Sequence, residues 1–146
     1  MAPKLFTIGY EALLPGPLVH ELEEADIRRV IDVRFRPQSR RPGMSKTRLG
    51  ALLAEHGIRY EHRRTLGTPA DLRVLYRTGR VAEAHAAFAA HVEAHSAEAL
   101  DALAAELPAA PATALLCLEA DPHVCHRSVL VARLRTRLDR LEVVDL

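Results

Sequence analysis

RVIDVR, at residues 29–34, is the stretch that decides the fold class. Val30 and Ile31 stand next to each other in it, so apolar side chains point to both faces, as in a buried strand of a parallel sheet. The runs ATALLCL at residues 112–118 and KLFTIG at residues 4–9 are of the same kind. Because helices must cover both faces of such a sheet, these runs predict an α/β fold.

The segments between these runs carry the apolar spacing and the end signals of helices. Ser45 and Ser96 stand at positions where we expect helix N-caps. Two further short strands are predicted at residues 58–62 and 141–144. We therefore predict one α/β domain over residues 1–146, with a mostly parallel sheet of about five strands flanked by helices. The helices are expected at residues 17–25, 46–56, 72–76, 81–95, 97–107 and from Cys125 or His126 to 138.

Length and composition exclude several classes of protein. The chain has 146 residues, of which 49% are hydrophobic and 27% charged, a globular composition. The charge-free stretch at residues 107–118 contains two prolines and is shorter than the about 20 apolar residues of a membrane span. Two cysteines are too few for a disulfide scaffold. We expect a cytoplasmic protein with no secretory signal and no membrane partner; the oligomeric state is not predicted.

Positive charge is concentrated in one part of the chain. The net charge is only +1, but residues 28–64 hold 11 basic and 3 acidic residues, a local charge of +8 that leaves −7 for the rest. Ten of the 11 basic residues are arginines, whose guanidinium groups suit two-point contacts with phosphate. Such a region attracts a phosphate-bearing ligand or nucleic acid; the alternative is a solvated basic face with scattered ion pairs.

Reactive side chains follow the ends of the predicted strands, where parallel sheets bind ligands. After the second strand, a loop rich in arginine and next to a helix start is expected to form an anion site. Asp32 is a candidate base there, or it simply pairs with Arg34 or Arg36. The residues expected to bind ligand in this region are Tyr10, Arg34, Arg36, Ser39, Arg40 and Lys46.

A second group follows the strand at residues 112–118. Cys125 at a helix start beside His126 and Arg127 is the setting of a stabilised thiolate, and so of a nucleophile. The alternative is a helix-cap cysteine of ordinary reactivity. Glu119 is a candidate base or a partner of Arg127, and Cys117 is either a ligand contact or a small buried side chain. Our candidate catalytic residues are Asp32, Glu119 and Cys125, and Cys117, His126 and Arg127 join the candidate ligand-binding set.

Metal and cofactor signals are weaker. The set Cys117, Glu119, His123, Cys125 and His126 contains metal-ligand types, but its spacing matches none of the common zinc patterns. His91 and His95, four residues apart on a predicted helix, are a further possible pair. The glycines show neither dinucleotide-binding nor P-loop spacing, and one residue between Cys125 and Arg127 excludes a phosphatase loop. We assign no metal ligands and name no cofactor.

Several short motifs follow one another along the chain. They are Thr7-Ile8-Gly9-Tyr10, Ile31-Asp32-Val33-Arg34, Arg36-Pro37-Gln38-Ser39-Arg40, Pro42-Gly43-Met44-Ser45-Lys46, Gly57-Ile58-Arg59-Tyr60 with His62 and Leu66-Gly67, Leu116-Cys117-Leu118-Glu119, and Cys125-His126-Arg127. Taken in this order, they resemble the bacterial and archaeal family known as domain of unknown function 488. The resemblance covers nearly the whole chain, with Met44 where the family pattern has Phe and Glu11 where it has a small polar residue. It implies a fold and a set of site positions but no reaction.

Our leading hypothesis from the sequence is an α/β domain with an arginine-rich pocket for a phosphate-bearing or nucleic-acid ligand; whether it is an enzyme that acts on this ligand is left open. The alternatives are a non-enzymatic module that docks nucleic acid or an acidic partner, and a metal-binding protein that uses Cys, His and Glu near residues 117–126. A further alternative is purely structural, with the charged groups bracing the loops.

Overall fold

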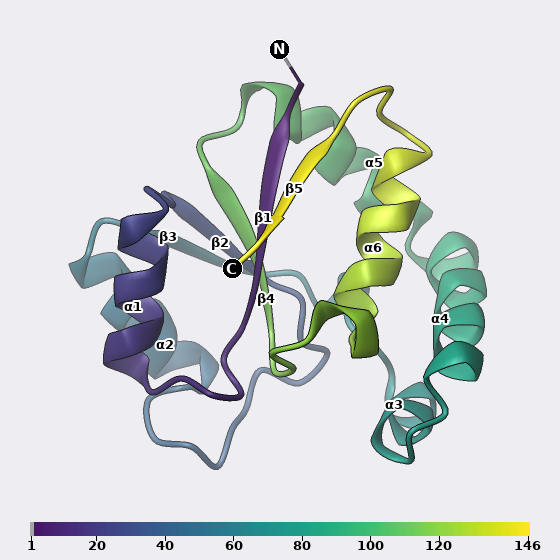
Figure 1. Ribbon diagram of the computed structural model, residues 1–146, viewed down its shortest axis with the longest axis horizontal. Coiled ribbons are helices and arrows are strands. Elements are labelled where there is room, and N and C mark those ends of the chain that lie inside the picture. The colour runs from purple at the N-terminus through teal and green to yellow at the C-terminus, as the bar shows by residue number, and fades with distance from the viewer. Residues whose placement is uncertain (1) are drawn as a thin grey trace.

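The computed structural model describes residues 2–146 and contains one sheet of five parallel strands. Their spatial order is β3-β2-β4-β1-β5 (Figure 1), and every neighbouring pair runs parallel. The predicted α/β fold is therefore confirmed. The strands are β1 (Lys4–Gly9), β2 (Arg29–Asp32), β3 (Arg59–His62), β4 (Thr113–Cys117) and β5 (Glu142–Asp145).

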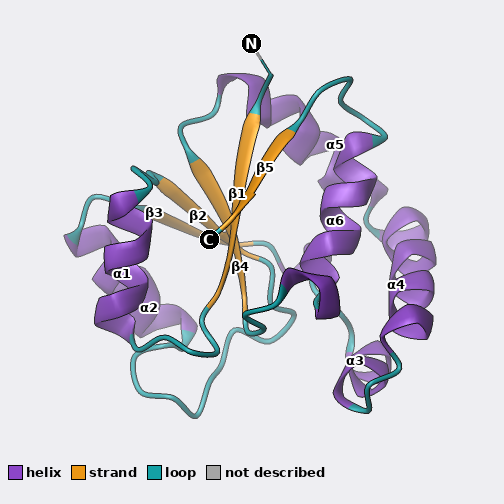
Figure 2. Ribbon diagram, viewed as in Figure 1, coloured by secondary structure: helices purple, strands orange, loops and turns teal. Residues whose placement is uncertain are grey.

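Helices cover both faces of the sheet (Figure 2). On one face lie α1 (Pro15–Glu24) and α2 (Lys46–Glu55). On the other lie α4 (Val81–His95), α5 (Ala97–Glu106) and α6 (His126–Arg135), while α3 (Ala70–Arg77) contacts α4 and contains no buried residue. Short 3₁₀ turns are η1 (Arg64–Leu66), η2 (Leu107–Ala109) and η3 (Pro122–Val124). No helix within residues 2–146 combines the length and the apolar character needed to span a membrane.

The two-sided apolar runs explain this layering, because successive strand residues point to opposite faces. Ile31 and Leu115 pack with Phe88 and the other buried side chains of α4, α5 and α6. Their neighbours Val30 and Leu116 pack on the opposite side, with the leucines of α1 and α2. Each central strand is thus buried on both faces, as its sequence predicts.

The two serines expected to cap helices bond to other partners instead. Ser45 and Ser96 occupy N-cap positions, but neither hydroxyl caps its helix. The Ser45 hydroxyl accepts a hydrogen bond from the backbone N–H of Ser39 at 2.9 Å, and the Ser96 hydroxyl donates to the carbonyl of Thr65 at 2.5 Å. Both side chains therefore satisfy the backbone of a neighbouring loop, which would otherwise leave polar groups unpaired.

A crevice forms at the carboxyl ends of β2 and β4. These strands are neighbours, yet the chain leaves β2 toward α2 on one face and β4 toward α6 on the other. Loops that part in this way leave a hollow at the edge of the sheet, which is where α/β proteins bind ligands. The topology therefore positions the functional site.

Gly9, at the end of β1, is needed for the loops of this crevice to come close. A Cβ atom there would lie 1.7 Å from the carbonyl oxygen of Glu119. We expect Gly9→Ala to lower the free energy of unfolding by about 2–3 kcal/mol, because backbone rather than a flexible side chain must shift. Urea denaturation followed by circular dichroism measures the change. Gly16→Ala is the control: its Cβ meets nothing within 4 Å, and a loss as large as that of Gly9→Ala would contradict the prediction.

Candidate functional site

A cavity of about 610 Å³ opens at the carboxyl edge of the sheet. Its walls come from the loops after β1 and β2, from α3, from the end of β4 and from the first residue of α6. The structure thus brings the early arginine loop and the late cysteine-histidine segment to one cavity. Of the residues singled out from the sequence, Tyr10, Arg34, Arg36, Arg40, Cys117, Glu119 and His126 line it.

Other predicted residues lie elsewhere. Ser39 and Lys46 line a neighbouring hollow of about 680 Å³ at the start of α2, which has no cysteine, histidine or carboxylate in its wall. Cys125 is buried behind His126, and Asp32 is fully buried beneath Arg34. Arg127 lines a different, smaller hollow. The cavity therefore unites part of the predicted site.

Arg34 and Asp32 form a buried ion pair. The Arg34 guanidinium donates to both carboxylate oxygens of Asp32, at 2.9 Å from Nε and 2.7 Å from Nη2, and to the carbonyl of Met44 at 2.8 Å. The Tyr60 hydroxyl donates to the same carboxylate, and burial raises the pKa of Tyr60. Burial by itself would lower the pKa of Arg34, but the bonds to Asp32 outweigh it and raise that pKa. Most of the hydrogen-bond donors of Arg34 and acceptors of Asp32 are therefore already paired within the fold.

Arg36, Arg73 and Arg77, in contrast, form an unpaired cluster, which we call the arginine cluster. Among residues 2–146, none of the three forms a salt bridge. Burial, followed by the positive charges of Arg36 and Arg77, lowers the pKa of Arg73. Arg36 and Arg77 thus each place a like charge near Arg73, and unpaired guanidinium groups gathered in the wall of a cavity are the arrangement that an anion stabilises.

Sequence reasoning missed Arg73 and Arg77, together with Thr68. The sequence does contain one sign of this pair: Arg73 and Arg77 are four residues apart, so they share one face of α3. What the sequence could not show is that this face meets the loop after β2. Thr68 is 3% exposed, and its hydroxyl has no hydrogen-bond partner although the residue lines the cavity. Such an orphaned polar group favours a bound polar ligand or water.

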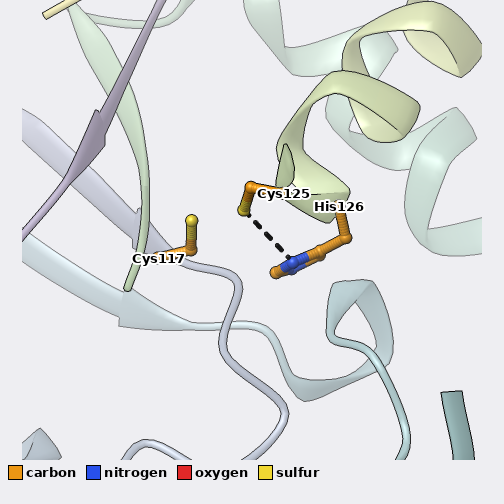
Figure 3. A group of neighbouring side chains, drawn as sticks. All are labelled: Cys117, Cys125 and His126. Carbon is orange, nitrogen blue, oxygen red and sulfur yellow. Dashed lines mark hydrogen bonds between the residues drawn. The ribbon is translucent and has the colours of Figure 1, made fainter. Parts of the chain in front are cut away.

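Cys117 and His126 form a buried part of the cavity wall, and Cys125 lies next to His126; we call these three residues the thiol corner (Figure 3). Cys117 ends β4, Cys125 is the N-cap of α6 and His126 its first helical residue. The Cys125 Sγ lies 3.6 Å from Nδ1 of His126 and accepts the backbone N–H of Arg127 at 3.5 Å. The Nε2–H of His126 donates to the carbonyl of Val33 at 2.8 Å.

Charge is unevenly distributed over the thiol corner. Burial raises the pKa of Cys117 well above its ordinary value. Burial would also raise the pKa of Cys125, but the hydrogen bond from Cys117 and the contact with His126 lower it well below that of a free thiol. Burial opposes a charge on His126, yet the neighbouring Cys125 raises its pKa. Burial, then the negative charge of Cys125, raises the pKa of Glu119.

Arg127 braces this corner from behind. Its guanidinium donates to the Thr7 hydroxyl at 3.0 Å and to the carbonyls of Glu119 at 2.6 Å and Ala120 at 3.4 Å. Only 1% of the residue is exposed. Arg127 therefore fixes the loop that carries Glu119, and the structure does not bring its guanidinium into the cavity with Arg34.

The fold and the site define an α/β protein whose cavity, at the carboxyl edge of a parallel sheet, joins unpaired arginines to a buried cysteine-histidine group. The model of the family described as Domain of unknown function DUF488 matches residues 17–134, most of the chain. The chain belongs to this family, as the motifs indicate. Comparisons with curated proteins and with solved structures found no match.

Proposed function

We propose that this protein is an enzyme that binds a small phosphate-bearing ligand in the cavity and acts on it beside Glu119. The observation that carries the proposal is the arginine cluster, three guanidinium groups without ion-pair partners in residues 2–146, facing the same cavity as the thiol corner.

Phosphate is the anion that fits the cluster best. A guanidinium offers parallel N–H donors that match two phosphate oxygens, and several guanidiniums together share one doubly charged group. The Thr68 hydroxyl, which has no hydrogen-bond partner, belongs to a residue of the same cavity wall. A cavity of about 610 Å³ has room for a nucleotide-sized molecule rather than for a free phosphate alone.

The position of Glu119 supports a reaction rather than binding alone. Among the described residues that line the cavity, Glu119 is the one that carries a carboxylate. Its Oε2 is 3.5 Å from the Cys117 Sγ. A carboxylate in an arginine-lined anion site weakens anion binding, so its presence favours a chemical role such as proton transfer.

Calorimetric titration tests the binding part, with inorganic phosphate, adenosine monophosphate and a single-stranded oligonucleotide as probes. We expect the mononucleotide to bind, and Arg73→Ala to weaken it about 10- to 100-fold through the loss of a charge-assisted contact. Arg28→Ala is the matched control, because Arg28 is exposed at the amino end of β2. The Arg28→Ala variant should bind the mononucleotide with the same affinity as the unchanged protein.

Equal affinities for Arg73→Ala and the unchanged protein would overturn the proposed site. An affinity that grows with oligonucleotide length and falls steeply with salt would indicate a nucleic-acid-binding module instead. The enzymatic part is tested by incubating the protein with a panel of phosphomonoesters and nucleotides and following products by mass spectrometry. Glu119→Gln should still bind the mononucleotide but form no product; a panel left unchanged by the native protein counts against an enzyme.

A further inference from the structure

The thiol corner has the composition and spacing of a metal centre. One ligand atom each from Cys117, Cys125 and His126 can be chosen so that all three lie within 4.8 Å of one another, and all three residues are buried. We propose that these residues bind a Zn²⁺ ion whose fourth coordination position opens into the arginine-lined cavity. The proposal that a metal binds here is argued from the geometry of the three residues alone. Only the proposal that a ligand reaches the fourth coordination position rests on the function proposed above.

The distance between the ligand atoms supports this assignment. Sulfur at 2.3 Å and nitrogen at about 2.05 Å from a tetrahedral zinc ion are roughly 3.6 Å from each other. The Cys125 Sγ and the His126 Nδ1 lie 3.6 Å apart. The Cys117 sulfur lies within 4.8 Å of the other two ligand atoms, close to the roughly 3.8 Å that separates two sulfur ligands of one tetrahedral zinc ion. Two sulfur ligands and one imidazole favour zinc over magnesium, calcium or manganese, which prefer oxygen.

The contacts around the ligands are those that orient a metal site. Histidines that bind metal donate their other ring N–H to a carbonyl or carboxylate, which fixes the tautomer and points the free nitrogen at the ion. His126 does this through Nε2 and the carbonyl of Val33, which leaves Nδ1 facing Cys125. The backbone N–H of Arg127 supports the Cys125 sulfur at 3.5 Å.

The fourth position faces the cavity because two of the three ligands line it. Cys117 and His126 are in the cavity wall, whereas Cys125 lies behind them. Glu119 stands beside this opening, with Oε2 3.5 Å from the Cys117 Sγ. Zinc held by three protein ligands with one open position is the arrangement of catalytic rather than structural sites. A polar group of the phosphate-bearing ligand would reach the open position while the arginine cluster holds the phosphate.

Metal analysis of the untagged, purified protein tests the site. We expect one zinc ion per chain by elemental mass spectrometry. After replacement by Co²⁺, the absorption spectrum should show thiolate-to-cobalt charge transfer and the intense visible bands of tetrahedral coordination. Cys117→Ser and His126→Asn should bind zinc at least about tenfold more weakly, measured by competition with a chromophoric chelator. His123→Asn, which removes an exposed histidine three residues away, is the control and should keep full metal content.

Three results would overturn the proposal. The first is a native protein without zinc that also gives no cobalt spectrum, a result that does not depend on whether the variants fold. The second is a Cys117–Cys125 disulfide in freshly purified protein. The third concerns the open position: loss of zinc from Glu119→Gln would make Glu119 a fourth ligand and close the site.

The two proposals fail in distinguishable ways. Arg73→Ala should lose mononucleotide affinity and keep its zinc. Cys117→Ser should lose zinc and keep the phosphate contacts of the arginine cluster. Binding of adenosine monophosphate to the cobalt form should shift its visible bands if the fourth position is open, and unshifted bands would contradict contact between ligand and metal.

Discussion

Asp32→Ala is expected to lower the free energy of unfolding by about 3–5 kcal/mol, because it leaves the Arg34 guanidinium buried without its counter-charge. Asp32 is 0% and Arg34 6% exposed, and two of the bonds between them measure 2.9 and 2.7 Å. The same substitution removes the acceptor of the Tyr60 hydroxyl. Against a total stability of about 5–15 kcal/mol for an ordinary domain, this loss is large.

Chemical denaturation measures this loss, with Asp139→Ala as the control. Asp139 is an exposed aspartate, so its replacement should change stability by less than about 0.5 kcal/mol. The double variant Asp32→Ala/Arg34→Met should recover part of the loss, because no charge then stays buried alone. A stable Asp32→Ala protein that has lost only activity would show that Asp32 is a catalytic base instead of a brace.

Arg127→Ala has the second large effect. It removes hydrogen bonds to the Thr7 hydroxyl and to the carbonyls of Glu119 and Ala120, and it empties space in the interior. Bonds from a charged donor contribute about 1.5–3 kcal/mol each and are not additive, so we expect a loss of about 3–4 kcal/mol. Arg127→Lys should recover less than half of it, since an ammonium group lacks the fork that reaches both sides.

Thermal and urea denaturation of Arg127→Ala and of Arg135→Ala give the comparison. Arg135 is exposed on the same helix and should tolerate replacement. Because Arg127 holds the loop that carries Glu119, its loss should also disturb the cavity. Unchanged stability together with lost mononucleotide binding would contradict this and would make Arg127 a ligand contact, which is the role the sequence suggested.

Much of the fold could be predicted from local patterns. The two-sided apolar runs around Val30 and Leu115 predicted buried parallel strands, and the helix at Val81–His95 has the expected bounds. The carboxyl-edge rule then predicted where Cys117 and Glu119 would lie. These inferences succeed because each depends on one segment and on a general property of parallel sheets.

The contacts inside the site could not be predicted in the same way. The pattern around Arg34 does not reveal that its donors are taken by Asp32 and the Met44 carbonyl, because the latter contact is set by how the following loop folds back. The role of Arg73 depends on packing between α3 and a loop more than thirty residues earlier in the chain. Arginine is common in this sequence, so residue type alone does not separate bracing arginines from unpaired ones.

The most direct test of the arginine-lined cavity as an anion site is a crystal structure grown with adenosine monophosphate. We predict phosphate density between Arg36, Arg73 and Arg77, with the rest of the nucleotide extending toward Glu119. A nucleotide bound only outside this cavity, or an empty cavity at a saturating concentration, would contradict it.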